Sequence, residues 1–233
     1  MRTTVLMNKK IDWLNHTLEL VVVFISITAA FMLENWRENR KERQLEQKYL
    51  DSFRDDLSAD AGVLNAIIPA NAAKLERAAK FLWVEMKNNN WPVDSAAVIL
   101  ANMMTVDPFQ RKKSTYESVK NSGSLGVLSD YEMRAKLVLY YDSFEDVGIK
   151  EKLYFDWLNA FVFPFINNHV DIAAQKILSV QAVRGPLFKN LLVGYYALLQ
   201  QNLQTYQSMN RMNAAVRAKL SQHREDGSSR IED

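Results

Sequence analysis

The chain has 233 residues, enough for one ordinary domain together with a membrane anchor. It contains no cysteine, which excludes disulfide bonds, thiolate nucleophiles and cysteine-bound zinc. The formal net charge is only +2, from 29 basic and 27 acidic residues, so no global field favours nucleic acid as a partner. Glycine and proline are scarce, and this composition favours an all-α fold.

An apolar segment near the N-terminus predicts one transmembrane helix. Residues 20–33 carry no charge, and Trp13 and Trp36 flank them 23 positions apart, about 35 Å at helical rise. Tryptophans at this distance are typical of anchors at the two interfaces of a bilayer. A cleaved signal peptide and a buried core helix are the alternatives. The continuation into a strongly charged helical stretch argues against the signal peptide.

Within this segment, Glu19, Ser26 and Ala30 fall on one helical face, because steps of seven and four residues return close to the same direction. Small and polar residues in such a stripe favour close contact between helices in lipid, and we predict an oligomer interface there. An intramembrane carboxylate is costly unless it is paired or near water. Glu19 therefore lies near the bilayer surface, one turn from His16, or forms a contact in the oligomer, or lines a pore together with Ser26.

The basic residues on the two sides of the predicted span are nearly balanced in number, so they indicate its orientation only weakly. The positive-inside rule compares the basic residues on the two sides of the apolar segment. Their count slightly favours a cytoplasmic position for the part of the chain that follows the span, although a large translocated domain can override it. The residues compared are Arg2, Lys9 and Lys10 on one side and Arg37, Arg40, Lys41, Arg43 and Lys48 on the other.

Residues 1–36 are thus predicted to hold the N-terminal tail and the transmembrane helix, and residues 37–68 a charged helical stalk that continues it. Leucine recurs every seven residues in this stalk, with phenylalanine and isoleucine at companion positions and Asp60 interrupting the register. The pattern predicts either a self-associating coiled coil or packing within a helical bundle of the same chain. The predicted packing residues are Leu50, Phe53, Leu57 and Leu64, with Ile67 as a further companion.

Residues 69–224 are predicted to form a helical bundle and residues 225–233 a disordered tail. Pro69 and Pro164 are expected to kink or interrupt helices. Two capping boxes, beginning at Ser114 and Ser129, predict helix starts, and a turn over residues 122–126 separates them. A cap at Asp94 or Ser95 and a loop at residues 88–92 are also expected. The helix that begins near Ser129 is predicted to carry a buried stripe of apolar and aromatic side chains, which are Met133, Leu137, Tyr140, Phe144 and Val147.

No catalytic, metal or cofactor site is predicted. The three histidines, His16, His169 and His223, have no metal-ligand spacing, and no phosphate-binding or nucleophile motif occurs. Carboxylates cluster on two helices, where such runs are normally solvated faces. An enzyme with a carboxylate-lined cleft stays open as a lesser alternative. The clustered residues are Asp55, Asp56, Asp60, Asp142, Glu145 and Asp146.

Two blocks of the sequence carry a resemblance to other proteins. The first runs from Glu19 to Trp36 and continues at residues 38–41 and 46–50, and the second covers residues 116–125 and Tyr140-Tyr141. These blocks resemble an uncharacterised bacterial family of small single-span membrane proteins with a helical domain of unknown function. Together they make up about a quarter of the chain. The resemblance implies a protein of the bacterial inner membrane, and it transfers no catalytic or binding residues.

Taken together, these patterns predict a membrane-anchored, non-enzymatic interaction or scaffold protein. Its expected partners are the lipid bilayer and other copies of itself or further membrane-protein subunits, and nucleic acid is not among them. A pore or transport accessory, lined by Glu19 and Ser26, is the main alternative.

Overall fold

The computed structural model describes residues 13–87, 91–174 and 176–229. Contacts between Cα atoms divide the chain into two compact units, Met1–Lys48 and Tyr49–Asp233. The predicted N-terminal tail with its basic residues, the asparagines at 88–90 and the end of the predicted C-terminal tail lie outside the described residues.

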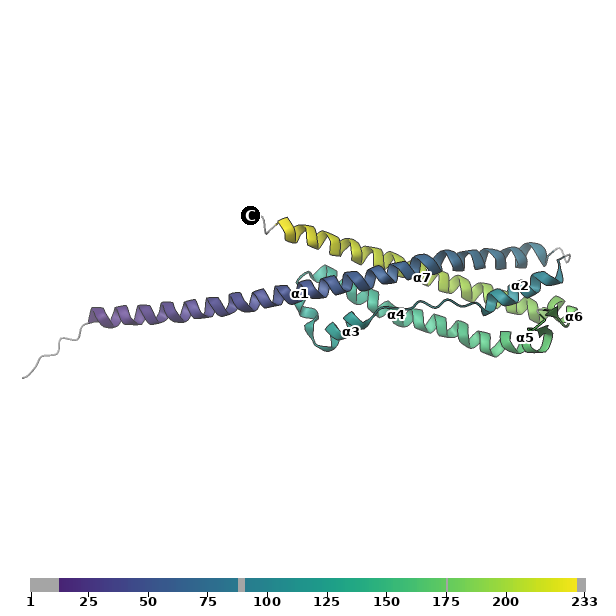
Figure 1. The fold of residues 1–233 in the computed structure, drawn as a ribbon, viewed down its shortest axis with the longest axis horizontal. Helices are drawn as coiled ribbons and strands as arrows, with labels where there is room; N and C mark the ends of the chain where they lie inside the picture. The colour runs from purple at the N-terminus through teal and green to yellow at the C-terminus, as the bar shows by residue number, and fades with distance from the viewer. Residues whose placement is uncertain (1–12, 88–90, 175, 230–233) are drawn as a thin grey trace, which may run out of the picture. The chain divides into compact units, whose positions relative to one another are not determined.

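The all-α prediction is confirmed, because helices account for nearly all of the described chain (Figure 1). The only strands among the described residues are β1 (Val170–Asp171) and β2 (Lys176–Ile177), which pair antiparallel. The long helices are α1 (Trp13–Lys80), α4 (Tyr131–Trp157) and α7 (Pro186–Ser229). The shorter elements are η1 (Phe81–Glu85), α2 (Val93–Met104), α3 (Ser114–Asn121), η2 (Ser124–Val127), η3 (Leu158–Val162), α5 (Phe163–His169) and α6 (Val180–Arg184).

Helix α1 is continuous through Pro69, so the helix does not restart there. A proline inside a helix removes one backbone donor and crowds the preceding turn. Asn71, two residues further on, is buried, and its side-chain amide donates a hydrogen bond of 2.8 Å to the Ile67 carbonyl. The residues around Pro69 belong to the packed second unit, and tertiary packing overrides a local propensity of this size.

The helix does not stop at Pro164, where a kink or an interruption was expected, and it changes type just before this residue. The π-helical turn η3 follows α4 directly and passes into α5, with Pro164 in the first turn of α5. The Phe163 N–H bonds to the Leu158 carbonyl, five residues back, and Pro164, which has no N–H to donate, directly follows this wider turn. Leu158 and Val162 of η3 are buried, so the chain remains packed through this transition.

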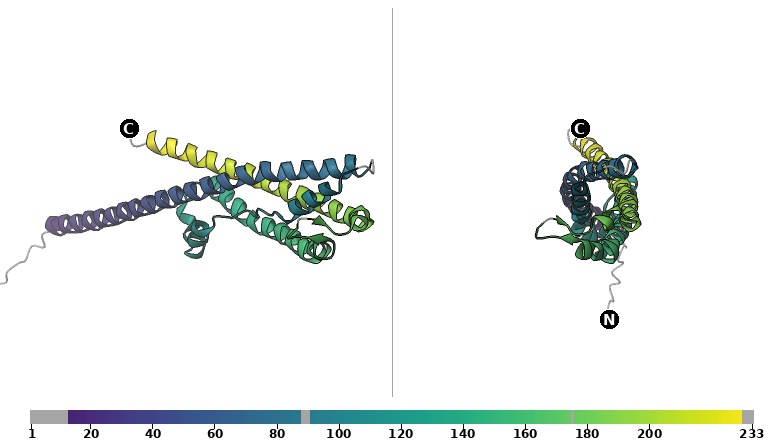
Figure 2. Two further views of the ribbon diagram at one scale, coloured as in Figure 1. Left: turned by 45° about the vertical axis from the view of Figure 1, so that its right-hand side comes forward. Right: turned by 90° about the vertical axis from the view of Figure 1, so that its right-hand side faces the viewer.

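In the second unit, α4 and α7 lie side by side, as both views of Figure 2 show. The α2, α5 and α6 helices gather at one end of this unit and α3 lies towards the other. Among the described residues, the buried apolar side chains form two hydrophobic clusters. One cluster joins α2, α5, α6 and the first half of α7, and it includes Trp91, Tyr195 and Phe188. The other joins residues 50–67 of α1 to α3, α4 and the second half of α7.

Helix starts were predicted close to their observed positions, but with the wrong caps. Helix α4 is capped by Asp130, whose Oδ1 accepts a hydrogen bond of 3.0 Å from the Met133 N–H, and not by Ser129. Ser114 is the first helical residue of α3 rather than its cap, and α2 has Pro92 at the capping position without a side-chain hydrogen bond. The turn predicted between α3 and α4 is present, and Gly123 within it has φ +71°, a conformation that glycine adopts without strain.

Candidate association surface

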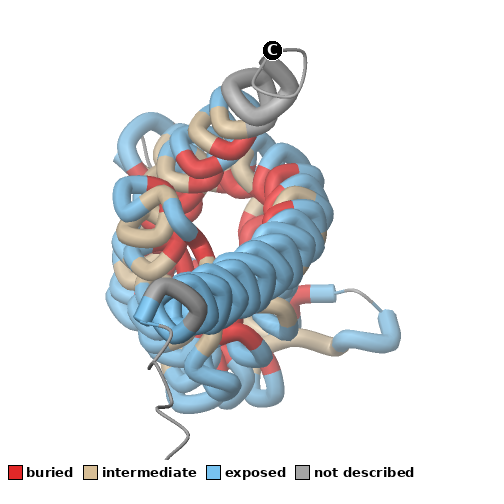
Figure 3. The backbone as a smooth tube through the Cα atoms, turned by 90° about the vertical axis from the view of Figure 1, so that its left-hand side faces the viewer, coloured by how far each residue is buried: buried red, intermediate tan, exposed pale blue. Residues whose placement is uncertain are grey.

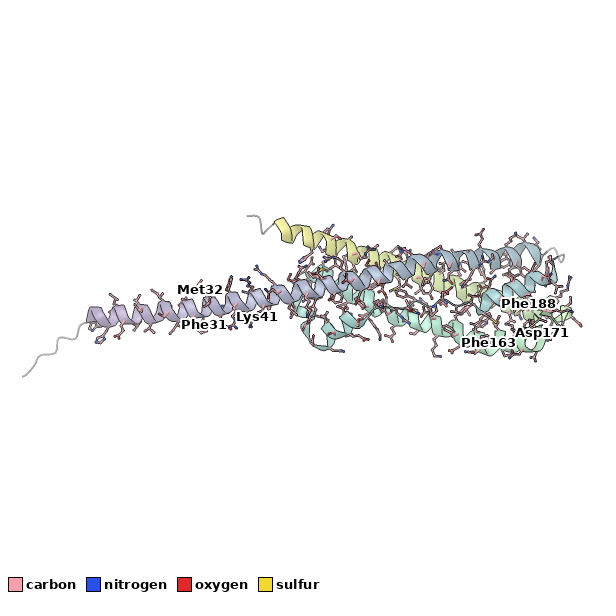
Figure 4. All side chains as sticks on the ribbon, viewed as in Figure 1. Phe31, Met32, Lys41, Phe163, Asp171 and Phe188 are labelled. Atoms are coloured by element: carbon pink, nitrogen blue, oxygen red, sulfur yellow. The ribbon has the colours of Figure 1, made fainter. Side chains whose placement is uncertain are left out.

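Helix α1 contains the predicted membrane span. Among the described residues, this is the one helix long and apolar enough to cross a membrane, and none of its most apolar 18-residue window is buried. Figure 3 shows the N-terminal part of α1 exposed along its length. Phe31 and Met32, which extend outwards from α1 in Figure 4, are 67% and 69% exposed. Contiguous apolar surface of this extent marks a membrane or protein contact.

The residues of the predicted stripe, Glu19, Ser26 and Ala30, are all exposed on α1. The Ser26 hydroxyl donates a hydrogen bond of 2.8 Å to the Val22 carbonyl, so its polar group is satisfied within its own helix. A serine bonded in this way presents a small surface that another helix can approach closely. Glu19 Oε2 lies 3.6 Å from Nδ1 of His16, so the carboxylate has a partner one turn away on the same helix.

The two predicted interface anchors are both exposed side chains of α1. Trp13 and Trp36 bracket the apolar stretch. The Arg40 guanidinium lies 5.3 Å from the ring of Trp36, within the range of a cation–π contact. An aromatic ring next to a cation that follows an apolar helix is the arrangement expected at the boundary between hydrocarbon and lipid headgroups.

The heptad residues of the predicted stalk have a different location. Leu50, Phe53, Leu57 and Leu64 are buried in the second unit, where they pack in the cluster that α4 and α7 complete. The ring of Phe53, for example, lies 5.9 Å from the ring of Tyr141 on α4. These residues therefore pack within their own chain.

Asp60 interrupts that heptad pattern, and the structure buries its side chain completely. The expectation of a solvated face is therefore wrong for this residue. Its Oδ1 accepts a hydrogen bond of 2.9 Å from the Lys112 N–H, and its Oδ2 accepts one of 2.8 Å from the Tyr140 hydroxyl. Asn213 on α7 donates through Nδ2 to the Tyr140 hydroxyl at 3.2 Å and to the Leu57 carbonyl at 2.9 Å. One buried carboxylate thus connects α1, α4 and the segment before α3.

Glu151 on α4 is a second buried carboxylate, and the sequence reasoning missed it. Its Oε1 accepts hydrogen bonds from the Phe109 N–H at 2.7 Å and from the Tyr206 hydroxyl at 2.9 Å. Its Oε2 lies 3.2 Å from Nη2 of Arg111. Asp60 and Glu151 therefore accept hydrogen bonds from the same two kinds of donor, a backbone N–H of the segment between α2 and α3 and a tyrosine hydroxyl.

We call residues 105–113, which join α2 to α3 without regular structure, the connecting segment. A third buried charge holds its beginning, since Lys74 Nζ donates to the Thr105 carbonyl at 2.8 Å and lies 3.1 Å from Asp107 Oδ2. A segment without regular structure that packs against a core has backbone N–H and carbonyl groups that need hydrogen-bond partners. Asp60, Glu151 and Lys74 supply such partners, and this role explains why these three charged side chains are buried.

The sequence contained a signal for both carboxylates. Glu151 lies four residues after Val147 and three before Tyr154, so it continues the buried stripe of α4. Asp60 likewise lies three residues after Leu57 and four before Leu64. A carboxylate at a core position of an amphipathic helix predicts a buried acceptor with a donor from elsewhere in the fold.

The protonation of this region follows from its burial. Burial raises the pKa of Asp60 above its ordinary value, while the hydrogen bonds from Lys112 and Tyr140 oppose the change. Burial also raises the pKa of Tyr140 and Tyr206, reinforced by the neighbouring carboxylates Asp60 and Glu151. Both phenols therefore keep their protons and act as hydrogen-bond donors.

The described part of the chain contains no group of three or more histidine, aspartate or glutamate side chains placed to hold a metal ion.

The fold and these surfaces define an all-α protein with one candidate membrane span. No family model matches the chain, and neither the curated proteins nor the solved structures that were searched contain a match.

Proposed function

We propose that this protein is a membrane-anchored, non-enzymatic interaction protein of the bacterial inner membrane that associates with itself as a subunit of a membrane complex. In this proposal the apolar part of α1 is a single transmembrane span and the second unit is a helical bundle. The observation that carries the proposal is that no residue of the apolar window of α1 is buried.

The exposed window supports a bilayer as its surroundings. Leu20, Phe24 and Leu33 are each between 66% and 71% exposed. Transfer of apolar surface out of water is favourable by about 25 cal/mol per Å², so a helix of such residues gains most from lipid or from other helices. The flanking tryptophans and the cation next to Trp36 fit the two interfaces of that bilayer.

The position of the heptad residues supports the span as the place of self-association. The sequence offered two surfaces for this role, the stripe of Glu19, Ser26 and Ala30 and the heptad pattern that includes Leu50 and Leu57. The heptad residues are buried against helices of their own chain, whereas the stripe is exposed. The stripe is therefore the surface that remains for a second copy.

The use of the buried carboxylates supports a non-enzymatic role. A catalytic acid or base must reach a proton of the substrate. The buried oxygens of Asp60 and Glu151 instead accept hydrogen bonds from Lys112, Phe109, Tyr140 and Tyr206 within the protein. Their chemistry is that of structural acceptors.

The test of self-association compares two variants of the full chain extracted in lipid nanodiscs and measured by native mass spectrometry. The double variant Ser26→Leu with Ala30→Leu fills the stripe. Thr28→Leu is the matched control, because Thr28 lies on the opposite face of the helix and its hydroxyl makes the same bond to its own backbone, 2.9 Å to the Phe24 carbonyl. We expect oligomers for the wild type and the control and monomers for the double variant. A monomeric wild type, or equal loss in the control, contradicts the proposal.

The side of the membrane can be tested because the chain has no cysteine. We propose that the second unit lies in the cytoplasm, following the small excess of basic residues after the span. Asn121, an exposed residue at the end of α3, is a suitable position for a single Asn121→Cys reporter. A membrane-impermeant maleimide should label it only after cells are permeabilised. Labelling in intact cells would place the second unit on the other side.

A further inference from the structure

A groove of about 620 Å³ lies within the second unit. One side is formed by η1 and the residues that follow it, and the other by the end of α6 and the beginning of α7. Figure 1 shows these segments at the end of the unit where α6 leads into α7. Neither the proposed span nor the connecting segment contributes to it. Sites for small molecules commonly have volumes of about 300–1,000 Å³, so the groove has a suitable size for one.

The floor of the groove is aromatic and firmly packed. Trp91 is only 4% exposed, and its ring lies 5.0 Å from the ring of Phe81 and 6.3 Å from that of Phe188. Trp83, by contrast, is 62% exposed at the same groove. A buried tryptophan held by two phenylalanines provides a preformed surface, and an exposed one next to it leaves apolar area to be covered.

The polar part of the lining is cationic. Lys87, Arg184 and Lys189 line the groove, and no carboxylate lies among its described lining residues. The Arg184 guanidinium is placed 5.4 Å from the ring of Trp91, so its position over the floor is stabilised by a cation–π contact. None of the three cations forms an ion pair within the part of the chain that the structure describes.

We infer that this groove binds a small organic anion with an aromatic or aliphatic body. The apolar body of the ligand would cover Trp83 and Trp91. Its carboxylate would pair with Arg184, Lys87 and Lys189. Guanidinium groups are well suited to carboxylates, because they offer planar pairs of donors. A neutral ligand of the same shape gains the apolar contact alone. This inference does not depend on the function proposed above.

Binding can be measured with 2-naphthoate as the probe and 2-naphthamide as its neutral counterpart. The full chain in zwitterionic nanodiscs is titrated with each compound by calorimetry, and tryptophan fluorescence is recorded in parallel. We expect 2-naphthoate to bind at least about tenfold more tightly than the amide, with an affinity that falls as salt is added, because screening weakens exposed ion pairs. Equal affinities for the two compounds, or no binding of 2-naphthoate at millimolar concentration, would overturn the inference.

Two substitutions of the lining test the location. Arg184→Gln and Lys189→Gln each remove one positive charge. Each should weaken the binding of 2-naphthoate several-fold and leave the affinity for 2-naphthamide unchanged. Lys176→Gln removes the same charge from β2, outside the groove, and serves as the control. Because Lys189 is exposed, its variant remains informative even where Arg184→Gln disturbs folding. An equal loss in the control would show a general effect of charge and would contradict the assigned site.

Discussion

The Tyr140 hydroxyl donates a hydrogen bond of 2.8 Å to Asp60 Oδ2, although the two residues lie 80 positions apart in the sequence. Through this bond α4 is joined to α1, and the amide of Asn213 adds α7 to the same hydroxyl. The other oxygen of Asp60 binds the connecting segment at Lys112. The buried carboxylate thus fixes several elements relative to one another within the second unit.

Asp60→Ala should destabilise the protein by about 1–3 kcal/mol, because it leaves the Lys112 N–H and the buried Tyr140 hydroxyl without their acceptor. Chemical unfolding of the full chain in detergent, followed by circular dichroism, measures the change. Asp55→Ala is the matched control, since Asp55 lies on the exposed face of the same helix. Equal effects of the two substitutions would contradict the structural role of Asp60.

The contribution of Asp60 should also depend on pH. Burial raises its pKa above the ordinary value of 3.8, so the folded protein binds this proton more tightly than the unfolded chain does. Its contribution to the free energy of unfolding is therefore largest below the ordinary pKa and declines as pH rises through the raised value. The difference between the wild type and Asp60→Asn, measured from about pH 4 to about pH 7, should show this decline. A difference that grows with pH would be inconsistent with it.

Asp130 should show the opposite dependence. The Met133 N–H that it caps holds the pKa of Asp130 below its ordinary value, with a smaller contribution from Lys219. Its stabilisation is therefore fully present above the ordinary pKa and is lost as pH falls through the lowered value. At neutral pH, Asp130→Ala should cost about 1 kcal/mol, the usual value of a helix cap. Thermal unfolding measures the loss, and a variant as stable as Asp55→Ala would exclude the cap.

Glu151 should protect the connecting segment from hydrogen exchange. Its Oε1 accepts the Phe109 N–H at 2.7 Å, so Glu151→Ala removes the acceptor of that amide. Mass spectrometry of exchanged peptides should show faster exchange over residues 105–113. Glu145→Ala, a change at an exposed position on the same helix, should leave these peptides unaltered. Unchanged protection in Glu151→Ala would mean that other contacts hold the segment.

Two glycines within helices should respond differently to alanine. No atom outside its own helix lies within 4 Å of a Cβ added at Gly62, so Gly62→Ala should raise the free energy of unfolding by about 1 kcal/mol through helix propensity. At Gly148 the added Cβ would lie 2.9 Å from Nη1 of Arg111, which donates to the Phe144 carbonyl. Gly148→Ala should therefore fail to gain the same stability. Denaturant unfolding of both variants measures the difference.

Several properties could be predicted from local sequence alone. The scarcity of glycine and proline indicated an all-α chain, and the uncharged run at residues 20–33 indicated a candidate span. The spacing of Met133, Leu137, Tyr140, Phe144 and Val147 identified a face of α4 that is indeed buried. These features depend on period and composition, which short stretches of sequence contain. The expected restart of the helix at Pro69 does not occur, because this part of α1 packs in the second unit, and the cap of α4 is the neighbouring residue Asp130.

The remaining features depended on the tertiary structure. The sequence placed Asp60 and Glu151 at core positions of their helices, yet their donors come from Lys112 and Phe109 in a segment without periodicity. A heptad pattern, similarly, does not say whether it packs against a second copy or against its own chain, because the same apolar face suits both. In the structure, Leu50, Phe53, Leu57 and Leu64 are buried against α4 and α7 of their own chain. Helix periodicity determines which face is buried, and only the three-dimensional arrangement determines what covers it.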